Sequence, residues 1–427
     1  MDGASETEDT KVNSEPPPRK PVTLRSILIR TVAATTMTGI YLLLLQAGHL
    51  YCILCGVVTQ FELYRELVNV RYVKAKEKKM PWFRTLQWLW FVVAMMHVYG
   101  DTLHDFCKTH RQKDDFWFLL TEKMSNSCFY LYCIVFVASV LTLRAGLVRF
   151  QISQYMWSIV TIVLVVFQCK FFATNTLNGL FWFFFPMATV VMNDVSAYFC
   201  GITMGRKFIR APFIALSPNK TWEGFLGAAV LTVIFSFFFP ALLSRWDWFT
   251  CPQPLITTNP FPPPLHCHDD PVKLGFFSPH NYRVHVPVLD MFWNLRLYPI
   301  QLHGLAYGLF ASLVAPFGGF FASAIKRAYN LKDFDSIVPG HGGMMDRMDC
   351  QLLMMGFTSF HYRSFIAPQM GIGSAEIFSA FCAFAGKNRT AATRLLLAMQ
   401  ARLGEEEGLL AVSAVSMAGS DQAPGGL

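Results

Sequence analysis

The sequence contains few charged residues for its length. Asp, Glu, Lys and Arg make up 15% of its 427 residues, whereas 53% of the residues are hydrophobic and 15% are aromatic. In soluble domains about a quarter of the residues are charged. This deficit excludes an ordinary set of soluble domains. It predicts an all-α, polytopic integral membrane protein whose partner is the lipid bilayer and not a nucleic acid.

Three other features are absent. The eleven cysteines form no disulfide-scaffold pattern, because most of them lie in apolar runs. The pair Cys52-x-x-Cys55 lies in a hydrophobic segment without a second pair, so a packing role is favoured over a zinc or redox site. The amino-terminus is acidic and polar, which argues against a cleavable signal peptide. No internal repeat of the kind found in many transporters is evident.

Apolar runs suited to membrane-spanning helices recur along the chain. A spanning helix needs about 20 mostly apolar residues, and from the runs present we expect roughly 8–10 transmembrane helices. The first two runs are separated by Gly48-His49 alone, which predicts a tight hairpin or one broken unit. The expected helices are 31–48, 50–68, 86–100, 128–144, 152–170, 177–200, 224–243, 300–322 and 351–367.

The segment from Ser323 to Asp349 is polar almost throughout, although it follows a long apolar run. Carboxylates are ligands for a hard cation such as Mg²⁺, Lys and Arg neutralise phosphate oxygens, and paired glycines let backbone N–H groups approach an anion. A loop of solvated charges is the alternative, but the complete set favours a site for a metal–polyphosphate. The cations include Lys326, Arg327 and Lys332, the carboxylates are Asp333, Asp335, Asp346 and Asp349, and the turn is Pro339-Gly340-His341-Gly342-Gly343.

The spacing within this segment supports the same interpretation. Asp346 and Asp349 are three residues apart, so they share one face of a helix. That helix is expected to begin just after Gly343, with its positive end beside bound anions.

Two further polar elements interrupt apolar stretches. Asp194 lies near the end of a Phe-rich run, and a carboxylate at membrane depth is a functional candidate because its burial in lipid is unfavourable. An interfacial residue that caps the next segment is the alternative. The string SPNKTWEG, residues 217–224, offers the ammonium of Lys220 and the hydroxyls of Ser217 and Thr221 to phosphate. Asn219 also begins a glycosylation sequon, which we expect to be unused because the loop should face the cytosol.

Together these elements resemble the signature of the phosphatidate cytidylyltransferases, also called CDP-diacylglycerol synthases, of the eukaryotic type. The resemblance extends from the basic segment near Arg19 to about Ile366. It includes the string 217–224 and an Asp-x-x-Ala-Tyr element at Asp194. The matching signature positions are Ser323, Lys326-Arg327, Lys332-Asp333, His341-Gly342-Gly343 and Asp346-Arg347-Met348-Asp349.

The resemblance implies that CMP is transferred from CTP to phosphatidic acid, giving CDP-diacylglycerol and pyrophosphate for phospholipid biosynthesis, with Mg²⁺ as the cofactor. The lipid phosphate is already a nucleophile, so catalysis would depend on positioning and charge neutralisation. Catalytic roles are expected for Ser323, Lys326, Arg327, Lys332, Asp333 and His341. Contacts to CTP or its phosphates are expected from Ser217, Asn219, Lys220, Thr221, Gly342, Gly343 and Arg347. The expected metal ligands are Asp346 and Asp349, followed by Asp333 and Asp194.

Two other functions remain open. A CTP-dependent lipid kinase would use the same nucleotide but would release CDP in place of pyrophosphate. A transporter or channel could use Asp194 in a substrate pathway. The charged cluster, however, is expected at one membrane face and not at the midplane.

The chain departs from the family pattern at two places. Bacterial members often have an acidic residue just before the signature serine, where this chain has Gly318-Gly319-Phe320-Phe321-Ala322. After about Ile366 the sequence no longer resembles the family, and a short amphipathic helix is expected at 390–403. This ending resembles an alternative or frame-shifted carboxy-terminus.

The organisation follows from these features. We expect a disordered cytosolic tail at 1–25, transmembrane helices at 26–170, a catalytic transmembrane domain at 171–367 and an atypical tail at 368–427. Basic residues before the first apolar run place the amino-terminus in the cytosol. Helix parity puts 205–223 and 323–349 together on the cytosolic side and 244–299 in the lumen, as a loop in which a Cys251–Cys267 disulfide is one alternative. The expected location is the endoplasmic reticulum membrane, and a homodimer is considered.

Overall fold

The computed structural model describes residues 24–77, 82–110, 116–209, 211–214, 220–253, 258–261, 267, 271–286, 291–335 and 342–367. The chain divides into two compact units, residues 1–267 with 300–358 and residues 268–299 with 359–427. The predicted amino-terminal tail up to residue 23 and the predicted tail at 368–427 lie outside the described residues.

The amino-terminal half of the first unit is helical. Gly48 separates the first two helices with a φ of 109°, a left-handed conformation that glycine adopts without a side-chain clash, so the predicted turn at this position is present. The third helix is longer than the expected 86–100, because polar residues extend it at both ends. The helices are α1 (Leu24–Ala47), α2 (His49–Glu77), α3 (Phe83–His110), α4 (Phe116–Glu122), α5 (Met124–Leu141), α6 (Val148–Ile162) with the π-helical turn η1 (Val163–Phe167), and α7 (Gln168–Leu177).

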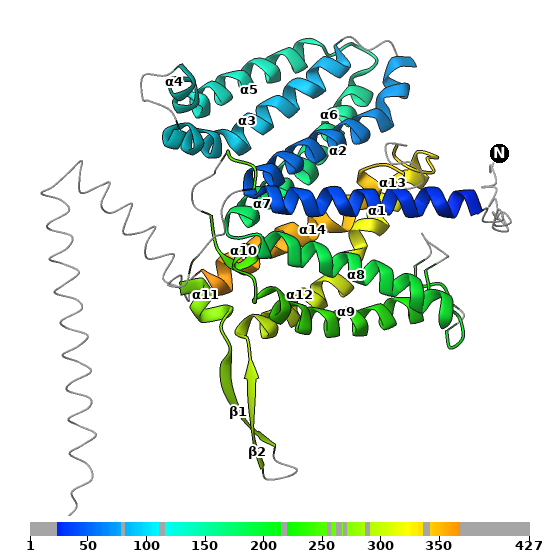
Figure 1. Cartoon of the computed structure of the whole chain (residues 1–427). Coiled ribbons are helices and arrows are strands. Elements are labelled where there is room, and N and C mark those ends of the chain that lie inside the picture. Colours follow the sequence, from blue (N-terminus) through cyan, green and yellow to red (C-terminus); the bar gives the residue numbers. More distant parts are fainter. Residues whose placement is uncertain are drawn as a thin grey trace, which may run out of the picture. The chain divides into compact units, whose positions relative to one another are not determined.

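The next helices form the frame of the candidate site. α8 (Phe181–Thr203) and α9 (Trp222–Leu243) pack side by side (Figure 1). α12 (Pro299–Leu313) packs closely on α9, since a Cβ added at Gly304 or Gly308 would collide with Ser236. Such pairs of small residues let helices approach closely in membranes.

The expected single helix over 300–322 is two helices. α12 ends at Leu313, and α13 (Pro316–Ala328) begins at a proline, whose ring and missing N–H interrupt the preceding helix. After a loop, α14 (Met345–His361) starts close to the predicted position just after Gly343.

Four stretches are long and apolar enough to cross a membrane among the residues that the structure describes. They are Val148–Leu177, Phe181–Thr203, Trp222–Leu243 and Pro299–Ala328, and a bent pair between residues 116 and 141 would make a fifth. The predicted class, a polytopic helical membrane protein, is confirmed. The expected total of 8–10 transmembrane helices stays a prediction.

One buried cluster connects the amino-terminal helices to the helices around the candidate site. Leu63, Tyr64 and Leu67 from α2 lie in the same cluster as Ile325 from α13 and Met345 from α14. Burial of each such side chain contributes about 1.5–3 kcal/mol. Helix α2 is therefore held firmly beside the 323–349 segment.

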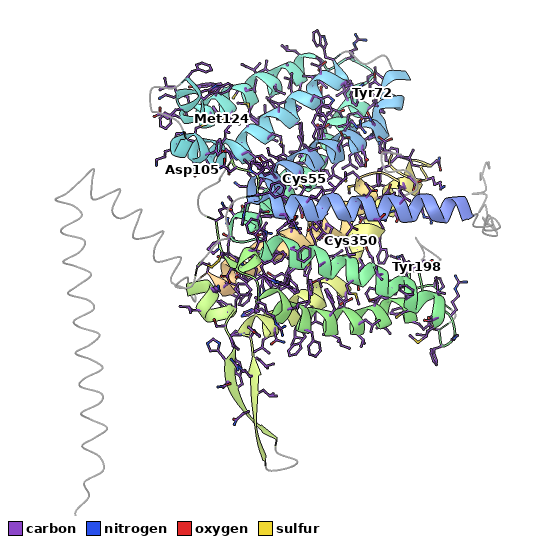
Figure 2. All side chains as sticks on the ribbon, in the orientation of Figure 1. Cys55, Tyr72, Asp105, Met124, Tyr198 and Cys350 are labelled. Atoms are coloured by element: carbon purple, nitrogen blue, oxygen red, sulfur yellow. A yellow bond between two sulfur atoms is a disulfide. The ribbon has the colours of Figure 1, made fainter. Side chains whose placement is uncertain are left out.

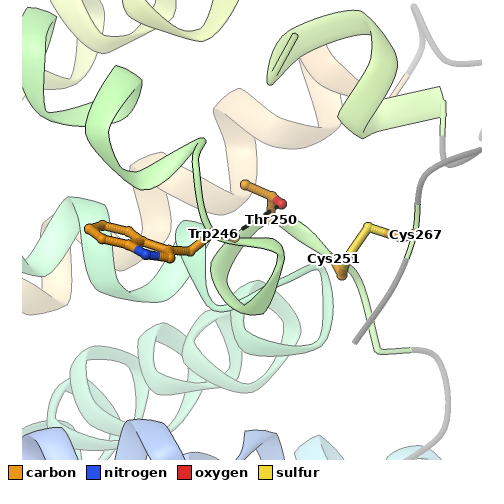
Figure 3. The surroundings of a disulfide bond; sticks show 4 residues. All are labelled: Trp246, Thr250, Cys251 and Cys267. Atoms are coloured by element: carbon orange, nitrogen blue, oxygen red, sulfur yellow. Dashed lines mark hydrogen bonds between the residues drawn. A yellow bond between two sulfur atoms is a disulfide. The ribbon is translucent and has the colours of Figure 1, made fainter. Parts of the chain in front are cut away.

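Cys251 and Cys267 form a disulfide, with an S–S distance of 2.00 Å (Figure 3), so the disulfide alternative is confirmed. Cys251 directly follows the short helix α10 (Asp247–Thr250). In that helix the hydroxyl of Thr250 donates a hydrogen bond to the carbonyl oxygen of Trp246 over 3.5 Å (Figure 3).

The second unit contains the only named strands in the described part of the chain. After α11 (Pro271–Phe276), β1 (His280–Val286) pairs antiparallel with β2 (Met291–Leu297), with His280 opposite Leu297. The segment 244–299, expected as a lumenal loop, thus contains a β-hairpin. The aromatic and β-branched residues at alternate positions of β1, Tyr282, Val284 and Val286, are typical of a strand and could have indicated the hairpin. The π-helical turn η2 (Tyr362–Ile366) also belongs to this unit.

Candidate active site

The candidate site begins at the carboxy-terminal end of α13, which carries Ser323, Lys326 and Arg327. The helix ends because Asn330 adopts a φ of 55°, and a left-handed residue stops a helix. Lys332 and Asp333 follow on an exposed turn.

Asp346, in the first turn of α14, is already paired with groups of the chain itself. Its Oδ1 accepts from the ammonium of Lys326 at 2.6 Å. Its Oδ2 accepts from the backbone N–H groups of Phe334 and Gly343, both at 3.1 Å. One carboxylate therefore joins α13, the turn after it and the start of α14.

Glu66 of α2 is a second carboxylate at this loop, and the sequence reasoning missed it. Its side chain is fully buried. Its oxygens accept from the N–H groups of Met344 at 2.7 Å and Met345 at 2.8 Å. The helix end that was expected to face bound anions therefore faces the chain's own carboxylates, as the positive end of the helix dipole favours.

The backbone conformation and the close packing explain why Gly342 and Gly343 precede α14. Gly342 has a φ of 86°, which disfavours residues with a Cβ. A Cβ at Gly343 would lie 2.8 Å from an oxygen of Glu66 and from the backbone nitrogen of Asp335. The close approach of these two groups requires glycine at position 343. The predicted phosphate contacts of both glycines stay predictions.

Asp349 and Asp194 form a different kind of pair. Asp349 lies one turn beyond Asp346 on α14, half-buried, and its Oδ1 accepts from the N–H of Cys350 at 2.7 Å. Burial is the main cause that raises the pKa of Asp349 to about 6; the carboxylate of Asp194 acts in the same direction, and Lys326 acts against it. Figure 2 labels Cys350, the residue after Asp349 on α14, and Tyr198, four residues after Asp194 on α8. Two carboxylates that interact in this way favour a cation between them.

Cations from three segments act electrostatically on this pair. Lys220 and Arg347 act electrostatically on Asp194, and Lys326 acts on Asp349. Asp194 and Lys220 are exposed, so the charged face is accessible to a ligand. The arrangement offers both signs of charge, as a metal–polyphosphate requires.

Gly318 and Gly319, where the chain departs from the bacterial pattern, lie against Asp349. A Cβ at Gly318 would collide with the carbonyl oxygen of Asp349, and one at Gly319 would lie 3.3 Å from Asp349 Oδ2. These glycines let α13 and α14 meet at the carboxylate. An acidic side chain in their place would be forced into the same space.

The loop between α8 and α9 is organised by Glu223, which the sequence reasoning quoted but gave no role. Its carboxylate accepts from the N–H groups of Arg206 at 3.1 Å, Phe208 at 2.9 Å and Ile209 at 2.7 Å. The hydroxyl oxygen of Thr221 caps α9 by accepting from the N–H of Gly224 at 3.1 Å. These bonds close the loop beside Lys220.

The chain next to Lys220 contacts α13, the helix in which the segment 323–349 begins. The ring of Phe213 lies tilted against the ring of Phe320 of α13, with ring centroids 5.8 Å apart. Lys220 and Arg347, one from each segment, both act on Asp194. Among the predicted site residues, Ser217, Asn219 and His341 lie outside the described residues.

A magnesium site fits the residues present, although no group of three or more His, Cys, Asp or Glu that could hold a metal lies within the described ranges. Mg²⁺ bound to nucleotides commonly takes one or two carboxylates and completes its shell with phosphate oxygens and water. Asp194 and Asp349 supply such a pair. Asp346 and Asp333 remain predicted ligands.

Comparison with known proteins shows the family of this chain. The sequence model of the cytidylyltransferase family matches residues 28–365. The chain belongs to the cytidylyltransferase family. Within this family it is 39% identical to a probable phosphatidate cytidylyltransferase of Dictyostelium discoideum over 370 residues, 86% of this chain and 76% of that protein.

Other relatives with the same function in their names are similar over most of their length. Phosphatidate cytidylyltransferase 1 of Arabidopsis thaliana is 37% identical over 81% of this chain and 80% of its own. Phosphatidate cytidylyltransferase 1 of Homo sapiens is 35% identical over 79% of this chain and 72% of its own. The predicted resemblance and the predicted enzyme class, a nucleotidyltransferase of the cytidylyltransferase family, are confirmed.

Proposed function

We propose that this membrane protein transfers CMP from CTP to phosphatidic acid and forms CDP-diacylglycerol and pyrophosphate. The observation that carries the proposal is the electrostatic interaction of Asp194 with Asp349, on which Lys220, Lys326 and Arg347 also act. This set suits a nucleotide triphosphate and a lipid phosphate together, because it combines cations for phosphate oxygens with carboxylates for a divalent ion.

The reaction needs no activated serine. A phosphate oxygen of phosphatidic acid forms a bond to the α-phosphorus of CTP, and the bond from that phosphorus to the bridging oxygen breaks to release pyrophosphate. The protein contributes orientation and charge neutralisation. Lys220 and Arg347 are assigned to phosphate oxygens, with Arg327 and Lys332 as further contacts. Ser323 and His341 are assigned to polar positioning.

Asp194 and Asp349 would hold Mg²⁺, which when bound supplies neutralisation of phosphate charge. We place them first among the four predicted ligands. The oxygens of Asp346 already bind Lys326, Phe334 and Gly343, so its main role is to hold the loop. Asp333 is exposed beside Gly342 and would act as a further ligand or phosphate-side residue.

We infer that the active site faces the cytosol and that the protein resides in the endoplasmic reticulum. The site lies at the amino-terminal end of α9, and the disulfide follows its carboxy-terminal end. α9 has 22 residues, which corresponds to a length of about 33 Å, close to the thickness of a bilayer core. Because disulfides persist in oxidising compartments, the Cys251–Cys267 end suits the lumen and the opposite end the cytosol. A homodimer stays a prediction.

One assay tests the proposed reaction. The purified full chain is incubated with phosphatidic acid, Mg²⁺ and CTP labelled in the cytidine, and both lipid-bound cytidine and free pyrophosphate are measured. Equal amounts of the two products are expected, and chelation of Mg²⁺ should abolish both. Release of CDP without lipid-bound cytidine would instead identify the lipid kinase considered above.

A further inference from the structure

Helix α2 contacts the loop at the candidate site from a part of the chain with no expected catalytic role. Glu66 is buried, and its two oxygens accept the N–H groups of Met344 and Met345 at 2.7 and 2.8 Å. Charge-assisted bonds of this kind are stronger than bonds between neutral groups. The start of α14 is therefore held by a residue 278 positions earlier in the sequence.

The neighbouring residue contacts the other side of the same loop. One guanidinium nitrogen of Arg65 pairs with Asp335 Oδ2 at 2.9 Å. Its Nε pairs with Glu62 at 2.9 Å on the same helix, which orients the guanidinium. Two consecutive residues of α2 thus hold Asp335 and the start of α14, and these contacts form the α2 grip.

The contacts of Glu66 and Arg65 position the residues to which the proposed function assigns phosphate and metal binding. Gly343 fits only because it lacks a side chain beside Glu66. Asp346, Arg347 and Asp349 all follow within the first turns of α14. A shift of the helix start would therefore move the residues assigned to phosphate and to the metal.

We propose that Glu66 and Arg65 are positioning residues that hold Asp335 and the start of α14 in the geometry that binds CTP. The amino-terminal helices are thereby part of the catalytic unit. This inference rests on the proposed function. It predicts that loss of the grip weakens CTP binding and leaves recognition of the lipid substrate unchanged.

The decisive variant is Glu66→Gln, which keeps the size of the side chain. Its amide oxygen can accept one N–H, but its NH₂ group faces the other N–H without an acceptor. KM for CTP should rise about ten- to a hundred-fold, since a misplaced binding group has effects of this size. KM for phosphatidic acid should change less than about twofold, because the contacts of Glu66 hold the residues Gly342, Gly343 and Arg347, which are predicted to bind CTP.

A matched control separates positioning from general destabilisation. Gln60 is equally buried on α2, but its amide contacts Val165, Val166 and Tyr99 and not the loop. Gln60→Met should lower the melting temperature and leave KM for CTP at the wild-type value. Arg65→Gln, at a partly exposed position, should raise KM for CTP by a smaller factor than Glu66→Gln and serves if the latter does not fold.

Direct binding of CTP, measured by equilibrium dialysis with Mg²⁺ present, distinguishes this inference from the proposed function. Wild-type protein that binds CTP but forms no CDP-diacylglycerol would contradict the function, and weaker binding by Glu66→Gln would still support the grip. Active wild-type protein with unchanged KM for CTP in both Glu66→Gln and Arg65→Gln would overturn the inference. An equal rise in KM for CTP in Gln60→Met would also overturn it.

Discussion

Two pairs of carboxylates meet near the start of α14, and they differ in what their oxygens bind. Glu66 and Asp346 accept backbone N–H groups and the ammonium of Lys326. Asp194 and Asp349 instead act on each other, and cations from the chain partly compensate their charges. The first pair is satisfied by the fold, whereas the second pair is suited to a ligand.

Residue type and spacing therefore do not determine the role of an acidic residue. Asp346 and Asp349 are one turn apart on the same face of one helix, yet the fold assigns them to different pairs. A carboxylate whose oxygens are all bonded within the protein stabilises its loop. One that faces another carboxylate favours a divalent ion from outside.

The largest expected effect comes from substitution in the pair Asp194 and Asp349. Asp349→Asn should lower the rate of CDP-diacylglycerol synthesis at least about a thousand-fold, because stabilisation by a bound metal is worth several kcal/mol. The measurement is initial rate at saturating CTP and phosphatidic acid, with Asp101→Asn, an exposed position on α3, as the control. Adding Asp194→Asn should cost little more, since the two groups act as a unit.

Near-normal synthesis by Asp349→Asn would remove this residue from the site. Strictly additive losses in the double variant would show that Asp194 and Asp349 act separately.

A smaller expected effect is on the free energy of unfolding, which should differ between substitutions in the two pairs. Asp346→Asn should lower the free energy of unfolding by about 2–4 kcal/mol, because Lys326 loses its partner and the bonded N–H groups lose a charged acceptor. Asp349→Asn should leave the stability unchanged or raise it, because repulsion from Asp194 is relieved. Thermal unfolding in detergent without divalent cations measures both. Equal destabilisation by the two variants would contradict the division into pairs.

The smallest effect concerns the loop beside Lys220. Thr221→Ala should lower the free energy of unfolding by about 1 kcal/mol, the usual value of a helix cap, whereas Thr221→Asn should keep the cap. Thermal unfolding measures the cap, and KM for CTP measures the predicted phosphate contact of the hydroxyl. If Thr221→Asn keeps wild-type KM for CTP, the hydroxyl acts only as a cap and the predicted contact is wrong.

Much of the architecture could be predicted from local sequence. Runs of apolar residues predicted helices at the positions of α1 to α3, α5 to α9 and α14, and Gly48 predicted the turn between α1 and α2. The signature residues predicted which two segments would meet. The hairpin β1–β2 was missed because its segment is rich in Pro and polar residues, which outweighed the alternating pattern of the strands.

Glu66 could have been predicted as a functional candidate. Like Asp194, it is a carboxylate within an apolar run, the expected helix 50–68. Its partner could not be predicted in this way, because the contact joins residues far apart in the chain. Glu223 was likewise within a quoted string, but its three N–H partners depend on the path of the loop at 206–209.

The sequence by itself determined the membrane class, the family and the set of charged residues at the candidate site, because composition, apolar run length and a long signature are local properties of the chain. Only the tertiary structure decided which acidic residues are bonded within the protein and which remain for a ligand. That division arises because α2, α8, α13 and α14 pack around one point, and hydrogen bonds there depend on distances that no local pattern encodes.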